Sequence, residues 1–268
     1  MSGRMPQKPE RRAVISFCIP AHDEEQLLPG TIAAINDAAE ALSLDFEIVV
    51  ADDGSTDRTA DVAVAVGARV IRIERRLISA ARNAAARAAG GDVIIFVDAD
   101  TRVHAAAVSQ AIAVLQSGGV GGGALVRFDG RVPVWATVMF ECMSLTYRLV
   151  GFSTGSFMFC TREAFTQSGG FDEQLFAKEE VHFAIALKRI GRFRLIQDRV
   201  LTSGRKLRAY SLGEWFGTFG RLALKGSRAM SSREGLDPWY GPRRPDSERP
   251  DSSLRQPRLT RGRKRSTA

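Results

Sequence analysis

The first hundred residues alternate short apolar runs with alanine-rich stretches whose apolar residues recur at helical spacing. A short apolar run bounded by turn signals is typical of a buried β-strand, and apolar residues at i, i+3 and i+4 are typical of a helix. We therefore expect strands over residues 13–19, 46–51, 69–73 and 93–97, and helices over residues 27–42, 57–66 and 77–89. Strands that alternate with helices of this size form βαβ units and a parallel sheet.

The pattern is looser after residue 104. Here we expect helices over residues 105–116, 132–152 and 178–190, and strands over residues 124–128 and 157–160. Residues 1–12 are polar and basic, and residues 231–268 are rich in Pro, Arg, Ser and Asp, so both ends are expected to be disordered. The sequence thus predicts a single α/β domain over residues 13–230, with a mostly parallel central sheet flanked by helices and a disordered basic C-terminal tail.

The composition suits a globular domain of this kind. The 268 residues are 44% hydrophobic and 25% charged, which is enough for a substantial core. The net charge of +8 is uneven, because residues 241–268 hold nine basic and three acidic residues. A basic tail can contact nucleic acid or anionic lipid. Such tails are more often simply solvated, so no specific nucleic-acid partner is expected.

The cysteines and the N-terminus point to a reducing compartment. Cys18, Cys142 and Cys160 stand singly in apolar stretches and show neither disulfide pairing nor metal-ligand spacing. The basic N-terminal residues are not followed by the apolar segment of a signal peptide. We therefore expect a cytoplasmic protein.

Residues 132–152 are nearly long enough and apolar enough to span a bilayer, but they include Glu141 and Arg148. Charges inside a spanning helix are costly. We expect an amphipathic helix that is either buried in the fold, the alternative we favour, or lies on a membrane surface. Peripheral contact with the inner face of the membrane therefore stays open.

Polar clusters follow three of the predicted strands: Pro20–Glu25, Asp52–Ser55 and Asp98–Asp100. The carboxyl ends of parallel strands meet at one edge of a sheet, where open α/β sheets bind their ligands. Two carboxylates as close as Asp98 and Asp100 need a cation nearby to ionise together. Their hard oxygen atoms favour Mg²⁺ or Mn²⁺. The other acids can accept hydrogen bonds from a nucleobase and a ribose. Together with the metal-binding pair Asp98 and Asp100, they suit a nucleotide diphosphate.

Each cluster also has a purely structural explanation. The first can favour a helix N-terminus, the second can be a turn ahead of a cap, and the third can be a polar turn at a strand end. The three clusters at one edge of the same sheet nevertheless favour a binding site over three unrelated turns.

Four segments carry a family resemblance. ISFCIPAHDEEQLLPGTIAAI, EIVVADDGSTDRTADVA and SAARNAAARAAGGDVIIFVDADTRV are similar, in order and spacing, to the N-terminal half of family 2 glycosyltransferases with the GT-A fold. GSFMFCTREAFTQSGGFDEQLFAKEEVHFAIALKRIG resembles the acceptor half of the same family. The resemblance implies a nucleotide-sugar-binding half over residues 13–104 and an acceptor half over residues 105–230. It also implies a nucleotide-diphospho-sugar donor, Mn²⁺ or Mg²⁺ as cofactor, and inversion at the anomeric carbon.

The resemblance also implies roles for the nucleoside end of the site. Pro20, Ala21 and Glu24 would line the nucleoside pocket, and Asp53 would receive the base. His22 departs from the aromatic or polar residue that is frequent in the family at this position.

The phosphate end follows in the same way. Asp98, with Ala99 beside it, would approach the ribose and the metal, and Asp100 would ligate the metal directly. Arg82 of the Ala-Arg-Asn motif would lie near the phosphates or this acidic loop. Arg205 belongs to a glycine-containing segment that related enzymes often use as a lid over the diphosphate, although a solvated basic loop explains it equally well.

On the acceptor side, Glu180 would be the general base that takes a proton from the acceptor hydroxyl, with Glu179 beside it. Family members commonly have aspartate at the base position, and glutamate can do the same work from one methylene further out. We expect the helix N-terminus to keep this carboxylate ionised. Ordinary electrostatics at a helix start is the alternative explanation for the pair.

The prediction is therefore a metal-dependent, inverting glycosyltransferase acting on an acceptor hydroxyl, with a lipid-linked acceptor left open. One alternative is a sugar nucleotidyltransferase, which usually needs a glycine-rich basic loop after the first strand, whereas this chain has acidic PAHDEE there. Another alternative is a non-catalytic protein that binds nucleotide sugars. The sequence does not identify the sugar, the nucleotide, the acceptor or the oligomeric state.

Overall fold

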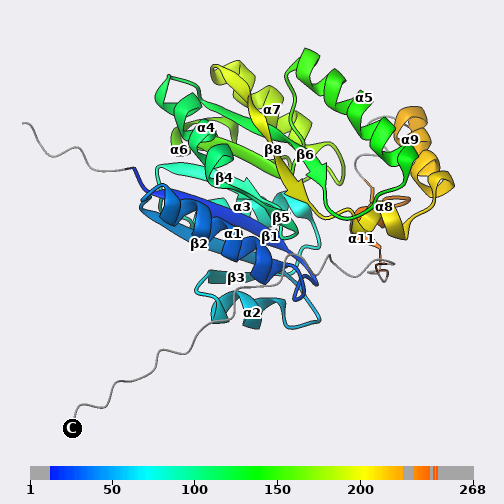
Figure 1. The fold of residues 1–268 in the computed structure, drawn as a ribbon, viewed down its shortest axis with the longest axis horizontal. Coiled ribbons are helices and arrows are strands. Elements are labelled where there is room, and N and C mark those ends of the chain that lie inside the picture. Colours follow the sequence, from blue (N-terminus) through cyan, green and yellow to red (C-terminus); the bar gives the residue numbers. More distant parts are fainter. Residues whose placement is uncertain (1–12, 226–231, 242–243, 245, 247–268) are drawn as a thin grey trace, which may run out of the picture.

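The computed structural model describes residues 13–225, 232–241, 244 and 246 (Figure 1). The expected disorder of residues 1–12, and of most of the tail, falls outside the described residues. The described strands are β1 (Ile15–Ala21), β2 (Phe46–Asp53), β3 (Arg69–Ile73), β4 (Val93–Val97), β5 (Thr101–Arg102), β6 (Gly121–Phe128), β7 (Phe157–Thr161) and β8 (Phe193–Thr202). The helices are α1 (Leu28–Ala41), α2 (Thr59–Ala65), α3 (Ile78–Ala88), α4 (Ala105–Gln116), α5 (Val134–Val150), α6 (Arg162–Ser168), α7 (Glu179–Ile190), α8 (Arg205–Ala209), α9 (Leu212–Lys225) and α11 (Asp237–Tyr240).

The strands form one mixed sheet with the order β3-β2-β1-β4-β7-β6-β8-β5. The four strands of the N-terminal half lie side by side and are parallel, as the alternation of strands and helices predicts. β7 is antiparallel to both of its neighbours, β4 and β6, and β6 and β8 are parallel to each other. The parallel part of the sheet is therefore the part that brings the acidic strand ends together.

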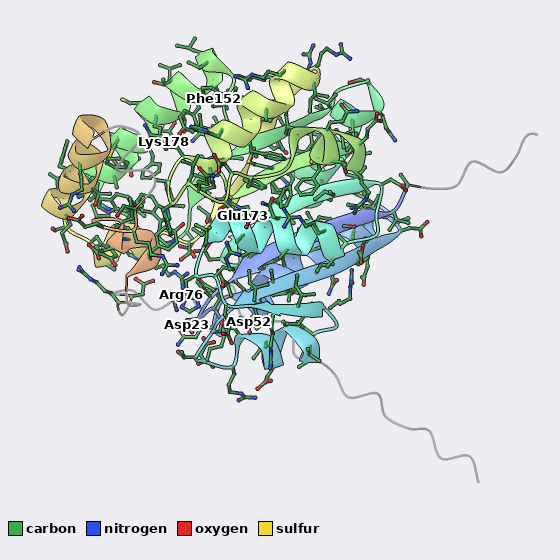
Figure 2. The ribbon with its side chains drawn as sticks, turned by 180° about the vertical axis from the view of Figure 1, so that it is seen from behind. Asp23, Asp52, Arg76, Phe152, Glu173 and Lys178 are labelled. Carbon is green, nitrogen blue, oxygen red and sulfur yellow. The ribbon has the colours of Figure 1, made fainter. Side chains whose placement is uncertain are left out.

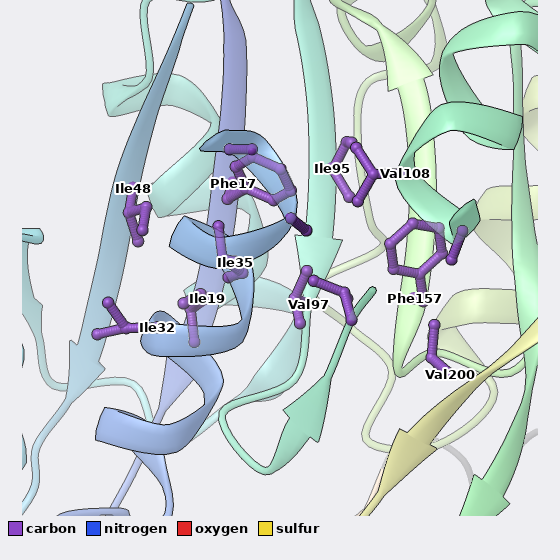
Figure 3. Packing of buried hydrophobic residues seen from close by; sticks show 14 of the residues in the cluster. Phe17, Ile19, Ile32, Ile35, Ile48, Ile95, Val97, Val108, Phe157 and Val200 are labelled. Atoms are coloured by element: carbon purple, nitrogen blue, oxygen red, sulfur yellow. The ribbon is translucent and has the colours of Figure 1, made fainter. Parts of the chain in front are cut away.

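Helices cover both faces of this sheet. α1 and α4 pack on one face, where Ile32, Ile35 and Val108 meet the strands (Figure 3). α3, α6 and α7 pack on the other face, where Phe165 and Phe183 lie in the core. The result is a three-layer α/β domain with two hydrophobic layers, one on each side of the sheet.

The double cover explains why the strands are continuous apolar runs. Successive side chains of a strand point to opposite faces, so Ile95 and Val97 of β4 enter one layer while Ile94 and Phe96 enter the other. A strand with only one buried face would instead alternate apolar and polar residues. β3, at the sheet edge, has no fully buried residue.

Element positions follow the sequence closely in the N-terminal half and less closely beyond it. β3 and β4 have the predicted bounds, and the predicted helix over residues 178–190 is α7. The prediction missed β8, whose mixed apolar and polar residues are typical of a partly exposed strand. It also treated Arg205 as part of a loop, whereas Arg205 begins the short helix α8.

Two expectations are wrong. The predicted helix over residues 132–152 exists as α5, but only Ala136 and Ser144 of it are buried, so it is not a core helix. The chain is also not disordered from residue 231 onward: residues 232–241 pack on the domain, with Leu236 only 1% exposed against Phe176 and Phe219. The composition of the segment hid this packing, because Leu236, Trp239 and Tyr240 are scattered among polar residues. Within the described residues, no helix is long and apolar enough to cross a membrane.

Candidate active site

A cleft with a cavity volume of about 420 Å³ lies at the carboxyl ends of β1, β2 and β4. Nearly all of the residues singled out from the sequence line it: Pro20, Ala21, Glu24, Asp53, Arg82, Asp98, Ala99, Asp100, Glu179 and Glu180. Arg205 reaches the same place through its contacts with two of these acids. The structure therefore brings the three acidic strand ends and the distant acidic pair into one site.

Backbone conformation is unusual around this cleft. Asp23, Arg76 and Lys178 have positive φ angles of 51°, 50° and 63°, and Figure 2 shows all three on the side of the molecule where the strands end. Non-glycine residues adopt this left-handed region at a cost and tend to do so near functional sites. Asp23 and Arg76 belong to the turns that follow β1 and β3, and Lys178 directly precedes α7.

Asp53 holds the loop after β3 in place. Its carboxylate accepts hydrogen bonds from the backbone N–H groups of Arg75 and Arg76 at 2.7 Å and of Leu77 at 2.6 Å. The side chain is buried, and Arg76 and Leu77 both line the cleft. Asp53 therefore shapes the wall of the nucleoside pocket directly, and a base that reached it would share an acceptor already engaged by the backbone.

Arg82 connects the donor-side acids with the acceptor-side acids. Its guanidinium contacts Asp98 and Glu179, each at 2.9 Å, and donates to the Gly155 carbonyl at 3.1 Å. Glycine at position 155 leaves room for this contact, because a Cβ atom there would lie 2.8 Å from the Arg82 guanidinium and force it to shift. Burial on its own would lower the pKa of Arg82, but Asp98 and Glu179 outweigh it and raise the pKa, so the charge is permanent.

Arg205 makes a second cationic link across the cleft. Its guanidinium forms an ion pair with Glu24 and lies 3.3 Å from Asp100. Burial would lower the pKa of Arg205, but Asp100 and Glu24 raise it. A cation is therefore already held beside Asp100, although Arg205 lies 105 residues later in the chain.

The donor atoms at this position fit a hard divalent metal. Asp98 and Asp100 offer carboxylate oxygens, which Mg²⁺ and Mn²⁺ prefer. Asp100 already forms an ion pair with a cationic side chain, Arg205. The described residues contain no group of three or more side chains able to enclose a metal ion.

The acidic pair opens α7, but its ionisation differs from the expectation. Glu179 is buried and paired with Arg82, whereas Glu180 is partly buried and lines the cleft. Burial, and then the neighbouring charge of Glu179, raise the pKa of Glu180 to about 8. The expected dominance of the helix N-terminus is therefore wrong: backbone N–H groups lower the pKa, but by less than burial and Glu179 raise it.

Aromatic side chains form the rest of the cleft, and the sequence analysis missed them. Phe140 and Tyr147 come from α5, Trp215 from α9, and Trp239 and Tyr240 from the C-terminal segment. Burial, and then Glu180, raise the pKa of Tyr147 to about 12, so it stays neutral. The Asp-Pro at the start of Asp237–Tyr240 was a usable signal, because proline is favoured in the first helical turn.

Most of the chain matches a known protein family. Residues 16–198 match the model of a family described as "Glycosyl transferase family 2". A glucosyl-3-phosphoglycerate synthase of Mycolicibacterium paratuberculosis is 39% identical over 94 residues, 32% of this chain and 28% of that protein. An undecaprenyl-phosphate 4-deoxy-4-formamido-L-arabinose transferase of Pseudomonas fluorescens is 36% identical over 100 residues, 35% of this chain and 30% of that protein. The alignments span less than a third of the length of these curated relatives.

Solved structures share the fold. A mannosyltransferase from Pyrobaculum calidifontis, in complex with GDP-Man and Mn²⁺, is similar with a TM-score of 0.58 at 20% identity, over 78% of this chain and 61% of that one. Glucosyl-3-phosphoglycerate synthase from Mycobacterium tuberculosis, in complex with Mn²⁺, UDP and phosphoglyceric acid, is similar with a TM-score of 0.54 at 21% identity, over 79% of this chain and 76% of that one. At these identities the likeness concerns the fold alone.

Proposed function

The chain belongs to glycosyl transferase family 2, and on this premise we propose that it transfers a sugar from a nucleotide diphosphate to an acceptor hydroxyl with inversion. Its fold is that of the GT-A glycosyltransferases. The observation that carries the proposal is the convergence of Asp53, Asp98, Asp100 and Glu180 on one cleft, although they come from three separate parts of the chain: the end of β2, the loop between β4 and β5, and the start of α7.

The donor would bind at the strand-end side of the cleft. Pro20, Ala21 and the loop held by Asp53 would enclose the nucleoside. Arg205 lies beside Asp100, so its guanidinium is placed to contact the diphosphate oxygens. Asp98, fixed by Arg82, would face the ribose. These roles agree with what the family resemblance implies for the same residues.

Asp100 and Asp98 would hold a divalent metal together with the diphosphate. When bound, such an ion stabilises the negative charge that develops on the leaving diphosphate. Structural neighbours solved with Mn²⁺ support this assignment.

Glu180 would act as the general base. The acceptor oxygen attacks the anomeric carbon, the bond from that carbon to the diphosphate oxygen breaks, and the hydroxyl proton passes to the Glu180 carboxylate. The raised pKa of Glu180 makes it a good proton acceptor once it is deprotonated. Glu179 would stay paired with Arg82 and hold the start of α7 in position rather than exchange protons.

The proposal is tested by nucleotide-diphosphate release from a panel of UDP and GDP sugars, with and without Mn²⁺. Asp100→Asn should lower release about a thousandfold, because metal positioning contributes several kcal/mol. Asp92→Asn is the matched control: it makes the same change at the other end of β4, where Asp92 is exposed. Undiminished release by Asp100→Asn, or by the parent protein in EDTA, would contradict the metal-assisted mechanism. Tight nucleotide binding without turnover on any donor would favour a non-catalytic role.

A further inference from the structure

Helix α5 is apolar on a side that no described part of the chain covers. Four residues on this side are highly exposed: Val134 (80%), Val138 (58%), Leu145 (61%) and Leu149 (79%). They follow one another at i, i+4, i+11 and i+15, which places them on one face of the helix; we call them the α5 stripe. A contiguous exposed apolar patch usually marks an interaction site.

The opposite face of α5 lines the cleft through Phe140, Met143 and Tyr147. The helix is therefore a wall with the cleft on one side and the α5 stripe on the other. α9 packs beside it, in a cluster that includes Ala136 and Trp215, and both views show the two helices at the same corner of the molecule (Figures 1 and 2). α9 adds exposed Leu212 and Phe216, at 41% and 64%.

Positive charge borders the stripe. Glu141 is the one acid of α5, and both oxygens of its carboxylate accept hydrogen bonds from the Arg199 guanidinium. The hydrogen bond from Arg199 lowers the pKa of Glu141, and the nearby charges of Arg148 and Arg127 lower it further. Arg199 thus pairs with the single carboxylate of α5, and Arg148, next to Leu149 on the same helix, adds a further positive charge beside the stripe.

We propose that the α5 stripe docks on the surface of an anionic lipid bilayer. An apolar helix face with a cationic border is the pattern of helices that lie in a membrane interface, and basic residues near the surface are attracted to anionic headgroups. A second copy of the chain fits less well, because a symmetric contact through the stripe would bring the two cationic borders together.

Docking of this kind would place the cleft beside the lipid headgroups. If the proposed function holds, the acceptor is then a group carried by a lipid, which reaches the cleft past α5. The aromatic side chains of Phe140 and Tyr147, which line the cleft, suit the apolar part of such an acceptor. This consequence rests on the proposed function, whereas docking itself does not.

Cys142 gives a direct probe of docking. It is the exposed cysteine, and it lies on α5 three residues before Leu145. Cys18 and Cys160 are fully buried, and burial raises the pKa of both thiols. An environment-sensitive fluorophore can therefore be attached at Cys142 in the full chain without changing the sequence.

Titration of the labelled protein with phosphatidylcholine vesicles, with and without phosphatidylglycerol, tests the proposal. We expect a blue shift with vesicles that contain phosphatidylglycerol and binding to them at least about tenfold tighter than to phosphatidylcholine alone. Leu145→Glu with Leu149→Glu should weaken binding at least about tenfold, because two apolar side chains no longer leave water. Val64→Glu is the matched control: Val64 is 60% exposed on α2, at the far end of the molecule from α5 (Figure 1).

Three results would overturn the proposal. The first is no blue shift of the fluorophore with anionic vesicles, and the second is equal vesicle binding by the double variant and the parent protein. The third is a blue shift that appears without vesicles and grows with protein concentration. The last would indicate a second copy as the occupant. The basic tail is present in every variant, so binding through the tail alone would show as equal binding. The vesicle titration needs no sugar donor. A failure of membrane docking can therefore be told apart from a failure of sugar transfer.

Discussion

At the scale of single residues, the cleft depends on two arginines that form ion pairs with four carboxylates. Arg82 is 4% exposed and pairs with Asp98 and Glu179, while Arg205 pairs with Glu24 and Asp100. Buried carboxylates are tolerated only when they are paired. Within the described residues, Glu180 forms no ion pair with an arginine, which fits its raised pKa and its proposed role as a base.

Glu180→Gln should keep donor binding and lose turnover. Glutamine has nearly the same shape but cannot accept the acceptor proton, so kcat should fall about a hundredfold or more while the nucleotide Kd stays within about twofold. In the parent protein kcat/KM should rise with pH towards about 8, where Glu180 loses its proton. Steady-state rates between pH 6 and 9 and nucleotide titrations measure both effects. Full turnover in the variant would place the base elsewhere.

Arg82→Met should destabilise the protein by about 3–5 kcal/mol, because it leaves the buried Glu179 carboxylate and the partly exposed Asp98 carboxylate without their partner. Urea unfolding of the parent and the variant measures the difference. Arg87→Met is the control on the same helix, where Arg87 is 62% exposed and pairs with Glu173 across 3.3 Å; its effect should stay within about 0.5 kcal/mol. Equal effects of the two substitutions would show that the buried network contributes little.

At the scale of elements, the C-terminal segment 232–241 completes the cleft. Arg233 donates hydrogen bonds to the carbonyls of Arg75 and Arg76, whose N–H groups bind Asp53, and its guanidinium lies over the rings of Phe176 and Tyr240. Leu236, within this segment, is buried. The loop on the nucleoside side is therefore held from both directions, by the end of β2 and by the C-terminal segment 232–241.

Truncation separates this segment from the tail. A chain ending after residue 241 should keep sugar transfer within about twofold, because the described residues that it loses, Arg244 and Asp246, do not line the cleft. They pair with Glu214 and Arg208 instead. A chain ending after residue 231 should bind nucleotide at least about tenfold more weakly, since it also loses Trp239, Tyr240 and the Arg233 contacts. Nucleotide titrations of the two chains decide this. Equal affinities would mean that the segment does not shape the donor site.

At the scale of the whole molecule, the raised pKa of Glu180 links stability to pH. The ordinary pKa of a glutamate is about 4.5, and that of Glu180 in the folded protein is about 8. The folded state therefore binds the proton more tightly than the unfolded state does. The stabilisation is complete below pH 4.5 and is lost as the pH rises to about 8.

Glu180→Gln should remove this pH dependence, because glutamine does not titrate. Near pH 5 the variant and the parent should unfold at similar urea concentrations, and near pH 8.5 the variant should be the more stable of the two. Unfolding free energies at several pH values measure the difference between the proteins, so other titrating groups cancel. A difference that does not change with pH would contradict the raised pKa.

The sequence by itself determined the parallel half of the sheet and the chemistry at its edge. Strands buried on both faces must be continuous apolar runs, and the acids that end them must meet where parallel strands end, so Asp53, Asp98 and Asp100 were predictable from local pattern. Only the tertiary structure decided what surrounds them: the bridges made by Arg82 and Arg205, the raised pKa of Glu180, the exposed face of α5 and the return of residues 232–241 to the cleft. These features depend on contacts between residues far apart in the chain and on burial. Neither long-range contacts nor burial of this kind produces a periodic pattern in the sequence.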